Sequence, residues 1–262
     1  MDFQRRQLAP CSDEAWEEME DAARDVLKAR LVARRVVDVA GPHGWQFSAV
    51  SEGRVRSMPA SETQAVRFAV RIVHPLIEAS TRFELSRTEL DDVARGAMDP
   101  ELTPLEDAAV AAALFEDSAV FRGLESAGIK GLRDQSVHTV AKGSESYLAA
   151  TVKSVDLLQR KGVDGPYSLV LPSDSWQELV DADPGYPMER HIEEIIGGAV
   201  IPSSSMADAY VVSLRGGDFQ LTLGQDFTLR YCSHTESAIT FDLVESFTFK
   251  AVDPRAIVRI TS

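Results

Sequence analysis

Residues 208–249 read DAYVVSLRGGDFQLTLGQDFTLRYCSHTESAITFDLVESFTF, and this stretch decides the fold class that the sequence predicts. Apolar and polar residues alternate here with a period of two, which is typical of strands with one buried face. The apolar positions are Phe219, Leu221, Leu223, Phe227, Leu229, Tyr231, Ile239, Phe241, Leu243, Phe247 and Phe249. Gly216 and Gly217 favour the positive φ angles of a tight turn, so we expect a hairpin at this pair.

Helical patterns precede these strands. Ser12 is a suitable N-cap, and the apolar spacing after it predicts an amphipathic helix that ends near Arg34 and Arg35. Thr103, Pro104 and Glu106 predict a capping box that opens the longest helix. Further helices are expected over 144–161, 173–180 and 188–196, with strands over 36–39 and 166–171.

The segment from Ser48 to Val73 predicts a long hairpin with one apolar face. Val66, Phe68, Val70 and Ile72 alternate there with more polar or smaller residues. A two-stranded ribbon is marginally stable alone, so this face needs a partner surface.

Composition limits the possible functions. The net charge is −14, from 27 basic and 41 acidic residues, which argues against nucleic acid as a main partner. No apolar run reaches membrane-spanning length, and residues 1–14 have no apolar signal core. Cys11 and Cys232 are the only cysteines, so we expect no disulfide framework and a reducing cytoplasm as location.

The sequence lacks the common catalytic and metal-binding motifs. Its histidines are isolated, and no HExxH, zinc-spaced Cys/His, GxSxG or phosphate-binding glycine motif occurs. Glu116-Asp117 and Asp91-Asp92 are adjacent pairs that point to different faces of a helix and make poor acid–base partners. We therefore expect no enzyme, no metal site and no cofactor.

Several short segments of the sequence, spread over nearly the whole chain, resemble one protein family. They are LAPCSDEAW, ARRVVDVAGPHGWQF, PLIEASTRFELSRTELDDVARG, FEDSAVFRGLESAGIKGL, GVDGPYSLVL, PGYPMERHIEEIIGG, RGGDF, LGQDFTLRY and VESFTF. In this order they resemble family 1 encapsulins, the linocin-like or bacteriocin-like shell proteins of bacterial nanocompartments. The resemblance implies an α+β fold of the Hong Kong 97-type phage major capsid protein.

The resemblance also implies a domain organisation and a function. An N-terminal helix or arm would span 1–36, an extended loop 48–73 and an axial domain 132–224, with the peripheral domain formed by 37–47, 74–131 and 225–262. About 60 copies, or a larger shell of about 180, would enclose a ferritin-like iron-storage protein or a dye-decolorising peroxidase held by a C-terminal targeting peptide. No membrane or nucleic-acid partner is expected. A prophage capsid and a bacteriocin- or protease-like enzyme are the alternatives.

Two sets of site residues follow from the resemblance. The cargo peptide would bind Leu27, Leu31, Arg34, Asp38, Asp226, Phe227, Leu229 and Tyr231. A pore at the five-fold axis would be lined by Asp181, Asp183, Pro184, Gly185 and Tyr186, whose carboxylates would favour cations. The segment Phe83–Leu90, where some members bind a flavin, has no Trp or Tyr to stack on, so no cofactor is expected.

Overall fold

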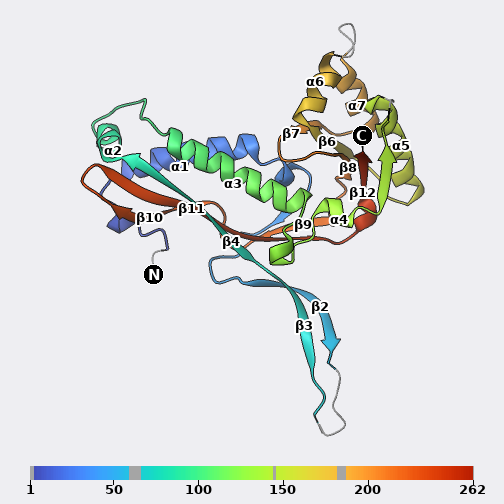
Figure 1. Ribbon diagram of the computed structural model, residues 1–262, viewed down its shortest axis with the longest axis horizontal. Helices are drawn as coiled ribbons and strands as arrows, with labels where there is room; N and C mark the ends of the chain where they lie inside the picture. The colour runs from blue at the N-terminus through green and yellow to red at the C-terminus, as the bar shows by residue number, and fades with distance from the viewer. Residues whose placement is uncertain (1–2, 59–65, 144–145, 182–186, 262) are drawn as a thin grey trace.

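Two five-stranded sheets and a projecting two-stranded hairpin organise the part of the chain that the computed structural model describes, residues 3–58, 66–143, 146–181 and 187–261 (Figure 1). In the first sheet the strand order is β1-β9-β11-β10, and β4 pairs with the other side of β11. These strands are β1 (Asp38–Ala40), β4 (Ile77–Ser86), β9 (Phe219–Leu223), β10 (Thr228–His234) and β11 (Ala238–Ala251). The alternation predicted for the closing stretch is confirmed, because its odd-numbered apolar residues form much of the core.

Two long helices cover one face of this sheet. Figure 1 shows α1 (Asp13–Arg30) and α3 (Thr103–Phe121) side by side across it. The Ser12 hydroxyl accepts a hydrogen bond from the Ala15 N–H at 3.2 Å, as its predicted capping role requires. Trp16 is fully buried and meets the Phe241 ring edge-on at a centroid distance of 5.7 Å. The helix α2 (Arg87–Ala94) follows β4 at the outer end of this layer.

The ends of α1 and α3 differ from the sequence prediction. The α1 helix stops at Arg30 rather than near Arg35, and the 3₁₀ turn η2 (Ala33–Arg35) follows. The Asp117 carboxylate accepts hydrogen bonds from the N–H groups of Val32 and Ala33 at 3.2 and 2.8 Å, which supports this turn in place of further α-helix.

The capping box predicted for α3 is wrong. Leu102, a buried residue, occupies the N-cap position, so Thr103 lies inside the helix. The N–H of Thr103 is instead paired with the Glu101 carboxylate at 3.1 Å. Pro104 stands in the first turn, where its missing N–H costs nothing.

The second sheet has the strand order β5-β12-β8-β6-β7. Its strands are β5 (His138–Ala141), β6 (Tyr167–Pro172), β7 (Val200–Ser203), β8 (Ala209–Ser213) and β12 (Ile257–Thr261). The helices packed around it are α4 (Leu132–Gln135), α5 (Tyr147–Arg160), α6 (Ser173–Asp181) and α7 (Met188–Ile196). The predicted helix over 188–196 is confirmed to the residue, and Gly197 ends it in the left-handed conformation.

The hairpin predicted at Gly216 and Gly217 is wrong, although both residues have positive φ. The strand before them, β8, pairs with β6 and β12, whereas the strand after them, β9, pairs with β1 and β11. The turn is therefore a crossing between the two sheets. Asp38 accepts a hydrogen bond from the Gly217 N–H at 2.6 Å and holds the turn against β1.

Strand pairing also differs from the predicted domain ranges at two places. Those ranges assign β9 to the axial domain and β12 to the peripheral domain. In the structure, β9 is hydrogen-bonded within the first sheet and β12 within the second sheet. Alternation of residue types predicts a half-buried strand without specifying which sheet it joins. The division of the chain into domains stays a prediction.

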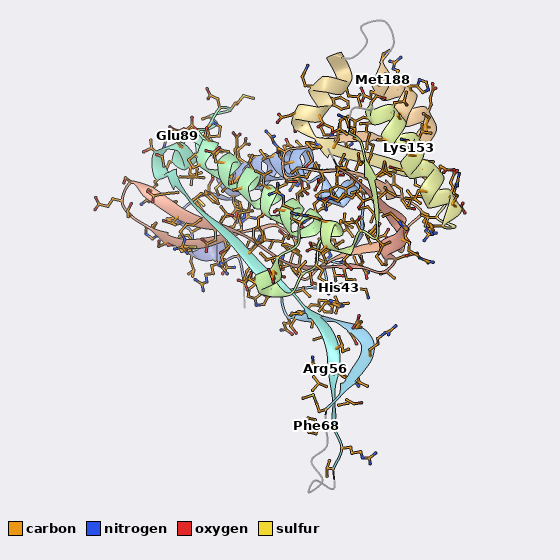
Figure 2. The ribbon with its side chains drawn as sticks, turned by 45° about the vertical axis from the view of Figure 1, so that its right-hand side comes forward. His43, Arg56, Phe68, Glu89, Lys153 and Met188 are labelled. Carbon is orange, nitrogen blue, oxygen red and sulfur yellow. The ribbon has the colours of Figure 1, made fainter. Side chains whose placement is uncertain are left out.

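The predicted hairpin projects away from both sheets. It consists of β2 (Ala49–Ser57) and β3 (Ala69–Pro75), which are antiparallel with a register shift between Ser51 and Val55. Figure 2 shows Arg56 and Phe68 on this arm, far from either sheet. Phe68 is 56% exposed, and the neighbouring Val66 and Val70 are exposed as well. A subunit alone therefore leaves this apolar surface in water.

Replacing Asp117 by Ala should destabilise the subunit. It would leave the N–H groups of Val32 and Ala33 without their acceptor, at about 1–3 kcal/mol for each group that stays buried. We expect the urea midpoint of the assembled protein to fall clearly. Asp107→Ala, on the exposed face of the same helix, is the control and should shift it little. Equal midpoints for the two variants would contradict this account of the η2 turn.

Candidate binding groove

A groove of about 590 Å³ lies between α1 and the beginning of β10. Its apolar lining comes from α1 and the residue after it, from β10 and the residue before it, and from β11: Ala23, Leu27, Leu31, Phe227, Leu229 and Leu243. Charged and polar residues complete the lining: Gln4, Glu20, Arg24, Lys28, Arg34, Arg35, Asp226 and Thr228. The groove therefore offers an apolar floor together with charges of both signs.

The structure brings together most of the residues that the sequence assigned to peptide binding. Leu27, Leu31, Arg34, Asp226, Phe227 and Leu229 all line this groove. The helix α1 presents Leu27 one turn after Ala23, and the strand β10 presents Leu229 opposite Leu243 of β11. These side chains converge because one face of the helix packs over one face of the sheet.

Asp38 and Tyr231 lie outside the groove lining. Asp38 sits on β1 beside a smaller cavity, and its carboxylate is paired with Gly217. Tyr231 is buried, its ring meets Phe241 edge-on, and its hydroxyl is 2.6 Å from Nδ1 of His234. Neither residue is among those that line the groove, and their assignment to peptide binding stays a prediction.

Arg34 lines the groove and forms a partly buried ionic cluster. Its guanidinium lies 2.6 Å from Glu116 of α3, 2.9 Å from Asp226 and 3.5 Å from Glu245 of β11. The guanidinium carbon also lies 5.2 Å from the centre of the Phe227 ring. Arg34 thus ties together the end of α1, α3, the sheet and the loop before β10.

The cluster holds three carboxyl groups against one guanidinium. The side chains of Glu116 and Glu245 are 0% and 1% exposed, so water does not solvate either carboxyl group. Burial raises the pKa of Glu245 well above its usual range, and the charge of Glu116 raises it further, while Arg34 lowers it. Burial also raises the pKa of Asp117 to about 7, although two backbone N–H groups oppose this. Burial and the neighbouring carboxylate thus act on Glu245 in the opposite direction to its cation partner Arg34.

Sequence reasoning missed Glu116, Asp117 and Glu245 as parts of this site. It interpreted the first two as an adjacent pair on different helix faces, but both are buried and serve different partners. The available signal was the position of Glu116 and Asp117 inside the stretch 108–121, which is otherwise rich in alanine and large apolar residues.

A second cavity of about 280 Å³ lies beyond Phe227 and Leu243, which line both hollows. It is bounded by β4 and α3, including Thr81 and Phe115, and Glu245 lines it too. Phe227 and Leu243 therefore separate the groove from a second hollow over the same sheet.

The predicted pore residues cannot be placed together. Asp183, Pro184, Gly185 and Tyr186 lie outside the described residues, and Asp181 is the last residue of α6. In the described ranges no group of three or more His, Cys, Asp or Glu side chains is arranged to hold a metal ion. Nor does any helix there combine the length and apolar character needed to cross a bilayer.

Replacing Arg34 by Met should destabilise the subunit, and more so at high pH. It would leave Glu116 and Glu245 buried without their cation, at about 3–5 kcal/mol if both ionised. The pKa of folded Glu245 would rise further above its unfolded value of about 4.3, so stability would fall as pH rises.

The measurement is the urea midpoint of wild type and variant at about pH 5.5 and pH 8. Arg24→Met is the control, because Arg24 is exposed at the groove and pairs with Asp21. A penalty that is the same at both pH values would contradict the role given to Glu245.

Comparisons with known proteins agree with the resemblance described above. A family model described as "Encapsulating protein for peroxidase" matches residues 1–248. The "Type 1 encapsulin shell protein" of Brevibacterium linens is 38% identical, over 98% of this chain and 98% of its own length. The protein of the same name from Rhodospirillum rubrum is 40% identical, over 97% and 94%.

Similarity to solved structures extends to capsids. A virus-like particle protein from Pyrococcus furiosus has a TM-score of 0.66 at 14% identity and covers 93% of this chain and 98% of its own. The capsid of an empty GTA particle has a TM-score of 0.57 at 17% identity, with 88% and 89% covered. At these identities the likeness shows the fold alone.

Proposed function

The chain belongs to the encapsulin family of shell proteins, and from this premise we propose that its shell encloses a cargo enzyme, which docks by a short peptide in the groove between α1 and β10. The fold is the Hong Kong 97-type capsid fold, of α+β class, and the protein forms a capsid-like assembly. Its relatives are named shell proteins rather than enzymes, in agreement with the absence of catalytic motifs.

The observation that carries the docking proposal is the groove itself. It encloses about 590 Å³, leucine side chains supply much of its apolar lining, and its charged lining residues can fix the orientation of an occupant. Apolar pockets with a few placed polar groups are typical of peptide and ligand sites. Six residues assigned from the resemblance line one hollow, which supports the peptide as its occupant.

We infer the cargo class from the family. The matching family is described by its encapsulation of a peroxidase, which supports a dye-decolorising peroxidase, and a ferritin-like iron-storage protein is the second candidate. We propose that the compartment is cytoplasmic and that a C-terminal peptide of the cargo is the loading signal. A peroxidase cargo would give the compartment a role in oxidative-stress defence, and a ferritin-like cargo would give it a role in iron homeostasis. A pore around Asp181 to Tyr186 would admit its small substrates.

The exposed arm of β2 and β3 supports the assembly mode. Its apolar face, with Phe68 and Val70, would be covered by a neighbouring subunit in a closed shell of about 60 copies, or about 180 in a larger one. A prophage capsid filled with DNA is the second candidate for the contents. The net charge of −14 and the named relatives favour protein.

Replacing Ala23 by Leu should reduce cargo loading without preventing assembly. Ala23 lines the groove, so a larger side chain there would fill space that the peptide needs. Ala29→Leu is the matched control, because Ala29 is exposed on the same helix and does not line the groove. Cargo copies per shell, counted by native mass spectrometry, should fall several-fold only for Ala23→Leu. Equal loading of both variants would place the peptide elsewhere.

Replacing Phe68 by Asp should prevent shell formation while leaving the subunit folded. Phe68 lies on the projecting arm and contributes nothing to the described core. Ala69→Asp changes the neighbouring residue, whose side chain points to the opposite face of the strand. Size-exclusion chromatography and mass photometry should show small species for Phe68→Asp and intact particles for Ala69→Asp. Normal particles from Phe68→Asp would contradict the proposed contact.

A further inference from the structure

The projecting arm of β2 and β3 has the opposite charge balance to the rest of the molecule. Residues 48–75 contain four arginines and two glutamates, whereas the rest of the chain contains 23 basic and 39 acidic residues. All four arginines of the arm are exposed: Arg54, Arg56, Arg67 and Arg71. The arm on which Figure 2 labels Arg56 is therefore a basic extension of an acidic molecule.

The register of the hairpin shows which arginines share a face with the apolar residues. Arg56 lies directly opposite Val70, and directly opposite residues of an antiparallel pair point to the same face. The Met58 N–H donates to the Phe68 carbonyl at 3.3 Å, so the pairing extends to Phe68. Side chains two residues apart along a strand share a face, which places Arg54 and Phe68 on this face as well. These four residues form the docking face of the arm: Arg54, Arg56, Phe68 and Val70.

The other two arginines lie on the opposite face. Arg71 is directly opposite Val55, one residue along each strand from the pair of Arg56 and Val70. Arg67 lies four residues before Arg71 and shares its face. Each face of the arm therefore carries two arginines. This arrangement allows an effect of the docking face to be separated from an effect of the total charge of the arm.

Covering the docking face would change the surroundings of its arginines. In an isolated subunit water solvates Arg56, whereas a neighbouring subunit packed on Phe68 and Val70 would displace part of that water. A guanidinium that loses water is costly unless an anionic acceptor replaces it, and carboxylates match its geometry. A second copy of this chain can supply such groups, because it exposes many carboxylates, among them Glu14 and Glu17 on α1.

We propose that the docking face binds a second copy of this chain through two kinds of contact at once. Phe68 and Val70 pack against apolar groups of that copy, and the guanidinium groups of Arg54 and Arg56 pair with its carboxylates. The charged pairs fix where the arm lies on the neighbouring subunit, because any other position leaves a guanidinium desolvated without an acceptor. This inference rests on the proposed function and specifies the chemistry of the surface that the arm contacts.

The charged contacts also oppose the mutual repulsion of the subunits. Each copy carries a net charge of −14, so copies repel one another at low ionic strength. A basic arm directed at carboxylates provides a local attraction that salt screens. The ion pairs should therefore contribute most to shell stability at low salt, and their contribution should shrink as the salt concentration rises.

The experiment compares two double variants that remove the same charge from opposite faces of the arm. Arg54→Gln with Arg56→Gln neutralises the docking face, and Arg67→Gln with Arg71→Gln neutralises the other face. Shells are dissociated in increasing urea at low and at high NaCl, and the intact particles are quantified by size-exclusion chromatography. We expect the docking-face variant to dissociate at clearly lower urea than wild type at low salt, and at nearly the same urea at high salt. The other variant should follow wild type at both salt concentrations.

The outcomes separate this inference from the proposed assembly mode. Equal urea midpoints for the two double variants at low salt would overturn the inference, as would a difference that high salt leaves unchanged. An unchanged midpoint together with loss of co-purified nucleic acid from the docking-face variant would assign the arginines to nucleic acid and overturn it too. In each case, loss of shells in Phe68→Asp keeps the arm as an assembly contact, whereas normal shells from Phe68→Asp overturn the assembly mode itself.

A chemical cross-link provides a second measurement. In Arg56→Lys shells, a water-soluble carbodiimide should join the new amine to a carboxyl group in contact with it. An amide bond forms, and the carbodiimide takes up the released water and becomes a urea. We expect covalent dimers on a denaturing gel, with a linked peptide that joins position 56 to an Asp or Glu, above the level in wild type. Arg71→Lys is the matched control and should add no dimer. No additional dimer for Arg56→Lys would overturn the inferred ion pair.

Discussion

The contact of Arg34 with Glu116 and Glu245 is the interaction on which the rest of the first layer depends. Two buried carboxyl groups on different elements need a cation between them, and the turn after α1 brings Arg34 there. Next to it, Asp117 fixes the same turn through its backbone N–H groups. These contacts set the end of α1 relative to α3 and the sheet, and the groove is the space that this geometry leaves open.

The sequence predicted elements with strong local signals and missed those that depend on distant partners. The helix at Met188–Ile196 and the alternating strands have patterns that local chemistry determines. The true end of α1 depends on Asp117, 84 residues away from Ala33, and no local pattern carries that information. The crossing at Gly216 was mistaken for a hairpin because glycine chemistry is the same in both.

The groove shows the same division between local and distant information. Leu27, Leu31 and Leu229 were expected to converge, because a helix stripe and a strand face both follow from periodicity and the family resemblance assigned them to one site. The buried acids behind Arg34 could not be assigned, since a charged residue in an apolar helix does not identify its partner. Asp38 and Tyr231 have the residue types expected for binding, but the turn at Gly217 and the core around Phe241 engage them instead.

The position of β12 constrains the order in which the molecule can be made. This strand lies between β5 and β8, so the second sheet is split until residues 257–261 have left the ribosome. The first sheet likewise waits for β11, the common neighbour of β4, β9 and β10. A nascent subunit therefore has neither sheet complete during most of its synthesis. A chain that stops before residue 257 lacks the strand that joins β5 to β8, so its second sheet stays divided.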